Sequence, residues 1–343
     1  MKTIQSVAVL AIFTIVASIL ILSGCTNNIE VGQEIEVELF ESKTELPSKI
    51  RLFFKVDLPE DLQSAVLEPS DFEIYEDGSR ISTLESQAKI QRERGDFLYS
   101  SILLLDLSGS ILNNADLPKL KEAATTFIDR TMPAAQENLY GTREMAVYWF
   151  DGEQEIHPLV FFTKNADTLK KGILSIDENI STDVSTNLNG AVIQGLNIMS
   201  SRLEEIRLNE DISTAGSMVI FTDGTDQAGR VSTAEALDAV KYTGNDQAVF
   251  TIGLGGEIDE EVLQSFGKNG FELAEDSLQL NETFLAIAER LESESNSYYV
   301  LEYCSPKRSG EHELELRALY EDRMGSFKTD FSAEGFTGGC SID

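Results

Sequence analysis

Histidine is nearly missing from this sequence, with only His157 and His312 among 343 residues. Histidine-based catalytic triads and zinc sites built on several histidines are therefore not expected. Basic side chains are also few: 27 Lys and Arg stand against 59 Asp and Glu, and the formal net charge is −32. The sequence has no basic patch for nucleic-acid phosphates and no polybasic segment for anionic lipids. We therefore expect no nucleic-acid partner.

Length and hydrophobic content indicate folded domains. The chain has no long low-complexity tract, and its 42% hydrophobic residues are enough to build cores. A length of 343 residues favours one large domain and one small domain.

The N-terminus has the pattern of a secretory signal. After one lysine, an apolar run covers residues 4–22 and ends in the tetrapeptide LSGC at 22–25. The run is just long enough for a membrane-spanning helix, but the tetrapeptide resembles the lipobox of bacterial lipoproteins. That resemblance implies a signal peptide over 1–24, acylation of Cys25 and a tether over 25–32.

Acylation would make this a lipid-anchored protein of the cell envelope, because two or three acyl chains anchor stably where one is marginal. Thr26 follows the cysteine, and a residue other than aspartate there suggests the outer membrane in diderm bacteria. In a monoderm the anchor would stay in the plasma membrane. The remaining pair, Cys304 and Cys340, favours a disulfide in an exported protein, with two unpaired buried thiols as the alternative.

The middle of the chain alternates apolar strands with amphipathic helices. Short apolar runs, typical of parallel strands covered on both faces, occupy 100–106, 145–151, 218–223 and 248–253. Helical periodicity appears at 120–128, 232–240, 259–266 and 280–291, and Ser232 and Glu235 have capping-box spacing. This order predicts an α/β domain over 96–295 with a doubly wound, mostly parallel sheet. Its ligand site should lie beyond the carboxyl ends of the strands.

Small oxygen donors gather at that predicted edge. Asp106 ends the first strand, Ser108 and Ser110 follow it, Asp223 ends the third strand, and Thr186 precedes a helix. Because loops at one sheet edge converge, we expect two carboxylates and three hydroxyls around one point. Hard oxygen donors without sulfur or imidazole suit Mg²⁺, Mn²⁺ or Ca²⁺.

The motif D-x-S-x-S, a later threonine and the aspartate of IFTDG resemble the metal-ion-dependent adhesion site of von Willebrand factor A domains. The likeness extends to VFTIGLGGEIDEEVLQSF, which is similar to the family's penultimate strand and following helix. It implies that Ser108 and Ser110 bind the ion directly, and that Thr186 binds directly or through water. Asp106 and Asp223 would act mostly through bound waters. The open coordination position would take an Asp or Glu carboxylate of a protein partner.

Other interpretations of the motif fit less well. Ser108 lacks a G-x-S-x-G elbow and a nearby histidine, so we expect no hydrolase and no enzyme. An aspartyl phosphotransferase loop would need a second aspartate at position 108. A helix or loop cap without metal is the structural alternative, and Asp183 and Asp226 are interpreted as solvated loop residues.

Both flanks carry strand patterns. They occur at 33–40, 50–57 and 71–82 before the α/β domain and at 297–303 and 312–320 after it, with a turn at Asp77-Gly78. Each flank is too short to fold alone. We therefore expect residues 33–95 and 296–343 to build one small β-sandwich-like domain into which the α/β domain is inserted.

These patterns predict a membrane-anchored, metal-dependent, adhesion-like protein that binds a protein ligand. The alternative is a non-adhesive assembly or regulatory subunit of a cell-envelope complex. The identity of the captured partner would separate the two.

Overall fold

A computed structural model describes residues 35–342 apart from 63–64, 66, 83–85, 92–96, 113–115, 138 and 210–211. Residues 34–343 form one compact unit. The predicted signal peptide, the tether and Cys25 lie outside the described residues. In the part of the chain that the structure describes, no helix has the length and apolarity needed to cross a membrane.

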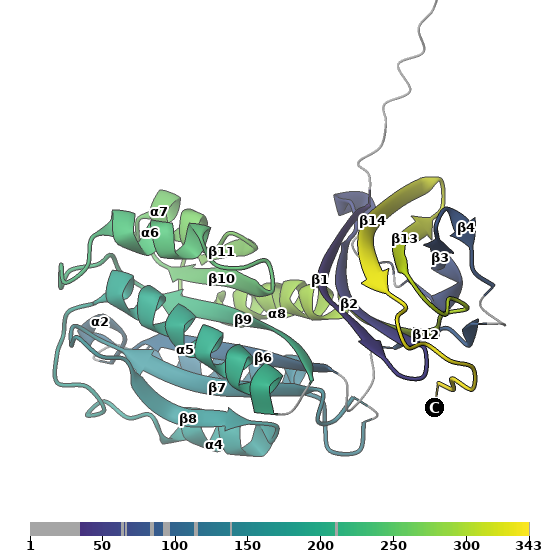
Figure 1. Ribbon diagram of the computed structural model, residues 1–343. Helices are drawn as coiled ribbons and strands as arrows, with labels where there is room; N and C mark the ends of the chain where they lie inside the picture. Colours follow the sequence, from purple (N-terminus) through teal and green to yellow (C-terminus); the bar gives the residue numbers. More distant parts are fainter. Residues whose placement is uncertain are drawn as a thin grey trace, which may run out of the picture. The chain divides into compact units, whose positions relative to one another are not determined.

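A six-stranded sheet forms the centre of the α/β segment, residues 97–296 (Figure 1). Its order is β11-β10-β9-β6-β7-β8, in which β8 is antiparallel to its neighbour and the other pairs are parallel. The strands are β6 (Phe97–Asp106), β7 (Arg143–Phe150), β8 (His157–Thr163), β9 (Ser213–Thr222), β10 (Gln247–Leu254) and β11 (Gly270–Ala274). The sequence predicts four of them. The edge strands β8 and β11 lack a buried apolar run, because most of their residues are only partly buried.

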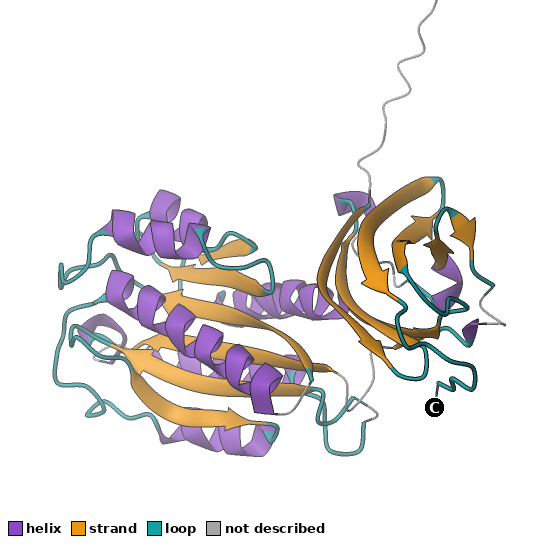
Figure 2. Cartoon of the chain, in the orientation of Figure 1, coloured by secondary structure: helices purple, strands orange, loops and turns teal. Residues whose placement is uncertain are grey.

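Helices cover both faces of this sheet (Figure 2). Along β6, Leu103 and Leu105 pack with α3, α4 and α8, whereas Ile102 and Leu104 pack with α5, α6 and α7. Burial on both faces explains why the strand is a continuous apolar run. The helices are α2 (Gly109–Leu112), α3 (Leu117–Thr131), α4 (Ala166–Ser175), α5 (Leu188–Asn209), α6 (Thr233–Lys241), α7 (Glu260–Phe266) and α8 (Leu280–Asn296).

Local caps begin two of the helices at the positions that the sequence indicates. The hydroxyl of Ser232 accepts a hydrogen bond from the backbone N–H of Glu235, and the Glu235 carboxylate accepts one from the backbone N–H of Ser232. The predicted capping box of α6 is therefore confirmed. Asp259 caps α7 through the backbone N–H of Val262.

Two four-stranded antiparallel sheets are built from the flanks. Their orders are β1-β2-β12-β5 and β14-β13-β3-β4, so each combines strands from before and after the α/β segment. The strands are β1 (Glu36–Glu45), β2 (Lys49–Asp57), β3 (Phe72–Glu76), β4 (Ser79–Arg80), β5 (Lys89–Gln91), β12 (Tyr298–Cys304), β13 (Glu311–Tyr320) and β14 (Arg323–Ser332), with short 3-10 helices η1 (Glu60–Leu62) and η2 (Pro69–Asp71). The predicted fold class is confirmed. The polar strand β14 was not predicted from the sequence.

Two local features of the β part agree with their predictions. Asp77 and Gly78 have positive φ values of 48° and 73° and connect β3 to β4 in a tight hairpin. Cys304 and Cys340 form a disulfide across a Cα–Cα distance of 5.8 Å.

Aromatic packing runs from the α/β segment into the flanks. Phe97 at the start of β6 has ring-centroid distances of 5.6 Å to Phe53 in β2 and 5.9 Å to Tyr298 in β12. One core cluster contains all three rings. Because packing is continuous here, the domain limits at 95/96 and 295/296 remain predictions.

Candidate metal site

Two carboxylates meet at the carboxyl edge of the central sheet. Asp106 is the last residue of β6, and Asp223 follows the last residue of β9. The two strands are parallel neighbours, with Leu105 in register with Phe221. Parallel neighbours end at the same edge, so both side chains belong to one site.

The turn after β6 brings two serines beside Asp106. The backbone N–H of Ser108 donates to Oδ1 of Asp106 at 3.0 Å. The hydroxyls of Ser108 and Ser110 lie 3.3 Å apart. Ser108 is buried and Ser110 is exposed, so this group of oxygens extends from the protein interior to the solvent.

Backbone contacts hold the Thr186 loop against this turn. The N–H of Gly109 donates to the carbonyl of Val184 at 3.1 Å, and the carbonyl of Thr186 accepts from the N–H of Gln227 at 2.9 Å. Gly224, the residue after Asp223, lies close to the Thr186 side chain, because a Cβ added at this glycine would be 3.7 Å from Oγ1 of Thr186. All five predicted site residues therefore gather at one edge of the sheet, while their role as metal ligands remains a prediction.

The two carboxylates are poorly compensated by protein groups. Burial raises the pKa of Asp106 to about 7, and the charge of Asp223 adds to this rise. Burial also raises the pKa of Asp223, against a hydrogen bond from Ser110 that lowers it. Oδ1 of Asp223 is buried and has no hydrogen-bond partner among the described residues. A divalent cation fits here, because it would offset both charges and interact with the unpaired oxygen.

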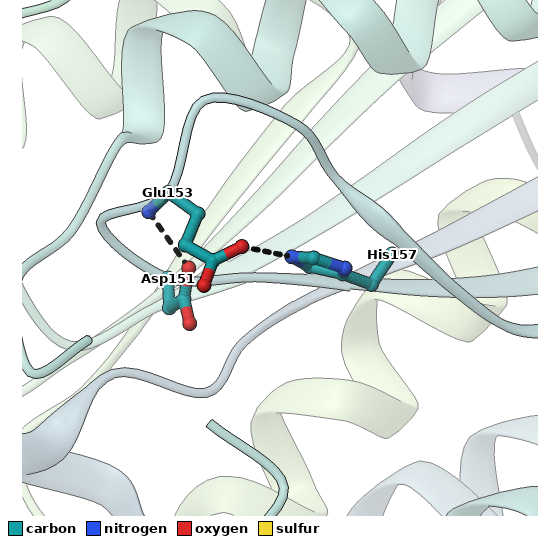
Figure 3. Close-up of side chains that lie close together, drawn as sticks. All are labelled: Asp151, Glu153 and His157. Atoms are coloured by element: carbon teal, nitrogen blue, oxygen red, sulfur yellow. Dashed lines mark hydrogen bonds and ion pairs between the residues drawn. The ribbon is translucent and has the colours of Figure 1, made fainter. Parts of the chain in front are cut away.

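A second group of potential ligands includes His157, for which the sequence predicted no metal role. Ligand atoms of Asp151, Glu153 and His157 lie within 4.8 Å of one another, so these residues can hold a cation (Figure 3). The sequence pattern that could have indicated this group is D-x-E-x-x-x-H, which directly follows β7. This cluster lies where β7 ends and β8 begins.

Protein contacts already engage this second cluster. Oδ1 of Asp151 accepts from the backbone N–H of Glu153 at 2.8 Å, and Oδ2 accepts from the hydroxyl of Ser181. Nε2 of His157 lies 3.4 Å from the Glu153 carboxylate, and its ring stacks on Trp149 with centroids 4.2 Å apart. Both oxygens of Asp151 are thus hydrogen-bonded, whereas Nε2 of His157 is buried and has no hydrogen-bond partner among the described residues.

A family model for the von Willebrand factor type A domain matches residues 102–284. The chain belongs to the von Willebrand factor type A domain family. The matched part, here called the A domain, contains all five predicted ligands and the Asp151 cluster. A comparison with curated proteins finds no match.

Solved structures similar to this chain include other A-domain proteins. A von Willebrand factor type A protein from Catenulispora acidiphila has 10% identity and a TM-score of 0.45, over 89% of this chain and 75% of that chain. The domain of the type V pili tip protein Mfa5 from Porphyromonas gingivalis has 13% identity and a TM-score of 0.45, over 57% and 96%. Proximal thread matrix protein 1 from the mussel byssus, with a zinc-occupied MIDAS motif, has 18% identity and a TM-score of 0.43, over 58% and 49%.

Proposed function

We propose that the A domain is a metal-dependent protein-binding module of a lipid-anchored envelope protein. Its site would hold Mg²⁺, or Mn²⁺ or Ca²⁺, through Asp106, Ser108, Ser110, Thr186 and Asp223. The observation that carries the proposal is the pair of adjacent, poorly compensated carboxylates at one sheet edge, with hydroxyl donors beside them.

The donor set supports a hard divalent cation. Carboxylate and hydroxyl oxygens are the ligands that these ions prefer. The serine and threonine hydroxyls carry no charge, so an ion bound mainly through them would keep its affinity for an anionic ligand. When bound, the ion would supply a Lewis acid for a partner's Asp or Glu carboxylate.

Charge near the site supports a dependence on metal. Asp116 and Glu257 interact electrostatically with Asp223 and make the site more negative. A partner's carboxylate would be repelled from this edge when no cation is present. Binding of the partner should therefore be lost in a chelator.

The anchoring part of the proposal rests on the LSGC tetrapeptide at 22–25, outside the described residues. Acylated Cys25 would hold the A domain at the outer membrane of a diderm or the plasma membrane of a monoderm. A partner would then be bound at that membrane surface.

The metal site is tested by calorimetric titration of the full chain with Mg²⁺ and Mn²⁺. Asp223→Asn removes one charge with almost no change of shape and should abolish measurable binding. Glu153→Gln is the matched control, because it removes one charge from the second cluster and should leave binding intact. If Glu153→Gln loses the ion and Asp223→Asn keeps it, the site belongs to the second cluster and the proposal is wrong.

Partner binding is tested separately with envelope extracts. Wild-type chain should retain a protein in Mg²⁺ and release it in EDTA, and Asp223→Asn should retain none. Replacing the acidic residues of the captured protein one at a time should identify the carboxylate that binds. Retention in EDTA at the wild-type level would contradict a metal-dependent interface.

A further inference from the structure

A buried hydroxyl contacts one of the two carboxylates of the proposed site. Thr222 is the last residue of β9, and its side chain is inaccessible to solvent. Its Oγ1 donates to Oδ2 of Asp106 at 2.6 Å and accepts from the backbone N–H of Gly224 at 3.2 Å. One oxygen atom thus connects the end of β6 to the turn that carries Asp223.

These contacts restrict how the Asp106 carboxylate can lie. Its Oδ1 accepts from the backbone N–H of Ser108, while its Oδ2 accepts from Thr222. The Ser108 side chain also hydrogen-bonds to this carboxylate. Because both oxygens are engaged, the plane of the carboxylate is set from both sides. The lone pairs that remain are the ones available to a cation or its waters.

We propose that Thr222 is a positioning residue of the metal site, which orients Asp106 and ties it to the Asp223–Gly224 turn without touching the ion. The inference rests on the proposed function, because it assigns a role within that site. Partners behind the ligands of a metal set the direction in which the ligand atoms point, and their removal typically costs about 10–100-fold in affinity.

A purely structural role is the competing explanation. A buried hydroxyl must find a hydrogen-bond partner wherever it lies, so a bond alone does not indicate function. Thr214 is also fully buried near the opposite end of β9, and its Oγ1 donates to the carbonyl of Leu98 at 2.6 Å. It has the same residue type, strand, burial and bond length as Thr222, and differs in lying away from the site.

This pair provides a matched experiment on the full chain. Mn²⁺ affinity is measured by calorimetry for Thr222→Val, Thr222→Ser and Thr214→Val, and urea unfolding in EDTA reports the stability of each metal-free variant. Valine keeps the shape of threonine and removes the hydroxyl, whereas serine keeps the hydroxyl. We expect Thr222→Val to bind Mn²⁺ about 10–100-fold more weakly, Thr222→Ser to recover most of that loss, and Thr214→Val to bind like wild type.

Equal Mn²⁺ affinities in Thr222→Val and Thr214→Val would overturn the inference while leaving the proposed function intact. Failure of Thr222→Ser to restore affinity, in a folded variant, would assign the effect to packing and also overturn it. Absence of Mn²⁺ binding in wild type would overturn the proposed function and this inference together. If Thr222→Val does not fold, Thr222→Ala is compared with Thr214→Ala by the same criteria.

Discussion

Reduction of the Cys304–Cys340 disulfide should destabilise the β-sandwich-like part of the protein and leave the A domain largely unaffected. The bridge links the end of β12 to the C-terminal segment across 36 residues. Opening a loop of this size returns entropy to the unfolded chain and costs about 4 kcal/mol of stability. Each kcal/mol shifts the Tm of a domain of roughly 100 residues by about 4–8 °C, so we expect a decrease of about 15 °C or more.

Metal should act on the other part of the chain. An ion at about 100 times its Kd stabilises the form that binds it by about 2.7 kcal/mol. Scanning calorimetry of the full chain is therefore run with and without Mg²⁺, and with and without reductant. Two transitions should appear, one that rises with Mg²⁺ and one that falls with reductant. A Cys304→Ser, Cys340→Ser double variant serves as control, because it should not respond to reductant.

A single transition that moves with both reagents would refute this reasoning. The contacts of Phe97 with Phe53 and Tyr298 would then couple the two parts into one cooperative unit. The predicted limits near residues 95 and 296 would not separate parts that unfold independently. Two transitions whose Tm values are both unchanged by the reductant would refute the loop-entropy estimate instead.

Other changes have equally definite outcomes. Gly109→Ala should weaken metal binding, because its Cβ would lie 2.8 Å from Cβ of Val184. The control Gly256→Ala should bind metal normally, because its Cβ would meet nothing within 4 Å. Equal metal affinities of the two variants in calorimetric titration would contradict this prediction. Burial raises the pKa of Glu76 above its ordinary value of 4.5, so this group's contribution to stability is present below that value and is lost as pH rises through the raised value. Glu76→Gln should reduce the fall in the free energy of unfolding as pH rises, measured by urea unfolding at several pH values. The same fall in the variant as in the wild type would contradict this role of Glu76. Cys25→Ser should remove fatty-acid labelling, and labelling that persists would place the anchor elsewhere.

Local sequence patterns predicted the four central strands, the starts of α6 and α7 and the order of the candidate ligands. Residues 102–105, directly before Asp106, indicated a strand buried on both faces, because all four are apolar. Ser232 and Glu235 indicated a helix start because the capping box needs only residues three apart. The site residues could be named because each follows or precedes such an element, and parallel strands end at a common edge.

Long-range packing decided the rest. The edge strands β8 and β11 and the polar strand β14 are held by pairing with a neighbour, which leaves little periodic signal in their own residues. The hydrogen bond from Thr222 to Asp106 joins residues that are 116 apart in sequence, so no local pattern around either residue predicts it. The residues Asp151, Glu153 and His157 are close in sequence, but the pattern alone did not show that their ligand atoms come within 4.8 Å of one another. Sequence alone determines which elements form and which chemical groups they carry, because hydrophobic period and capping act within a few residues. Only the tertiary structure determines which of those groups meet, because burial selects one arrangement of faces that no short stretch specifies.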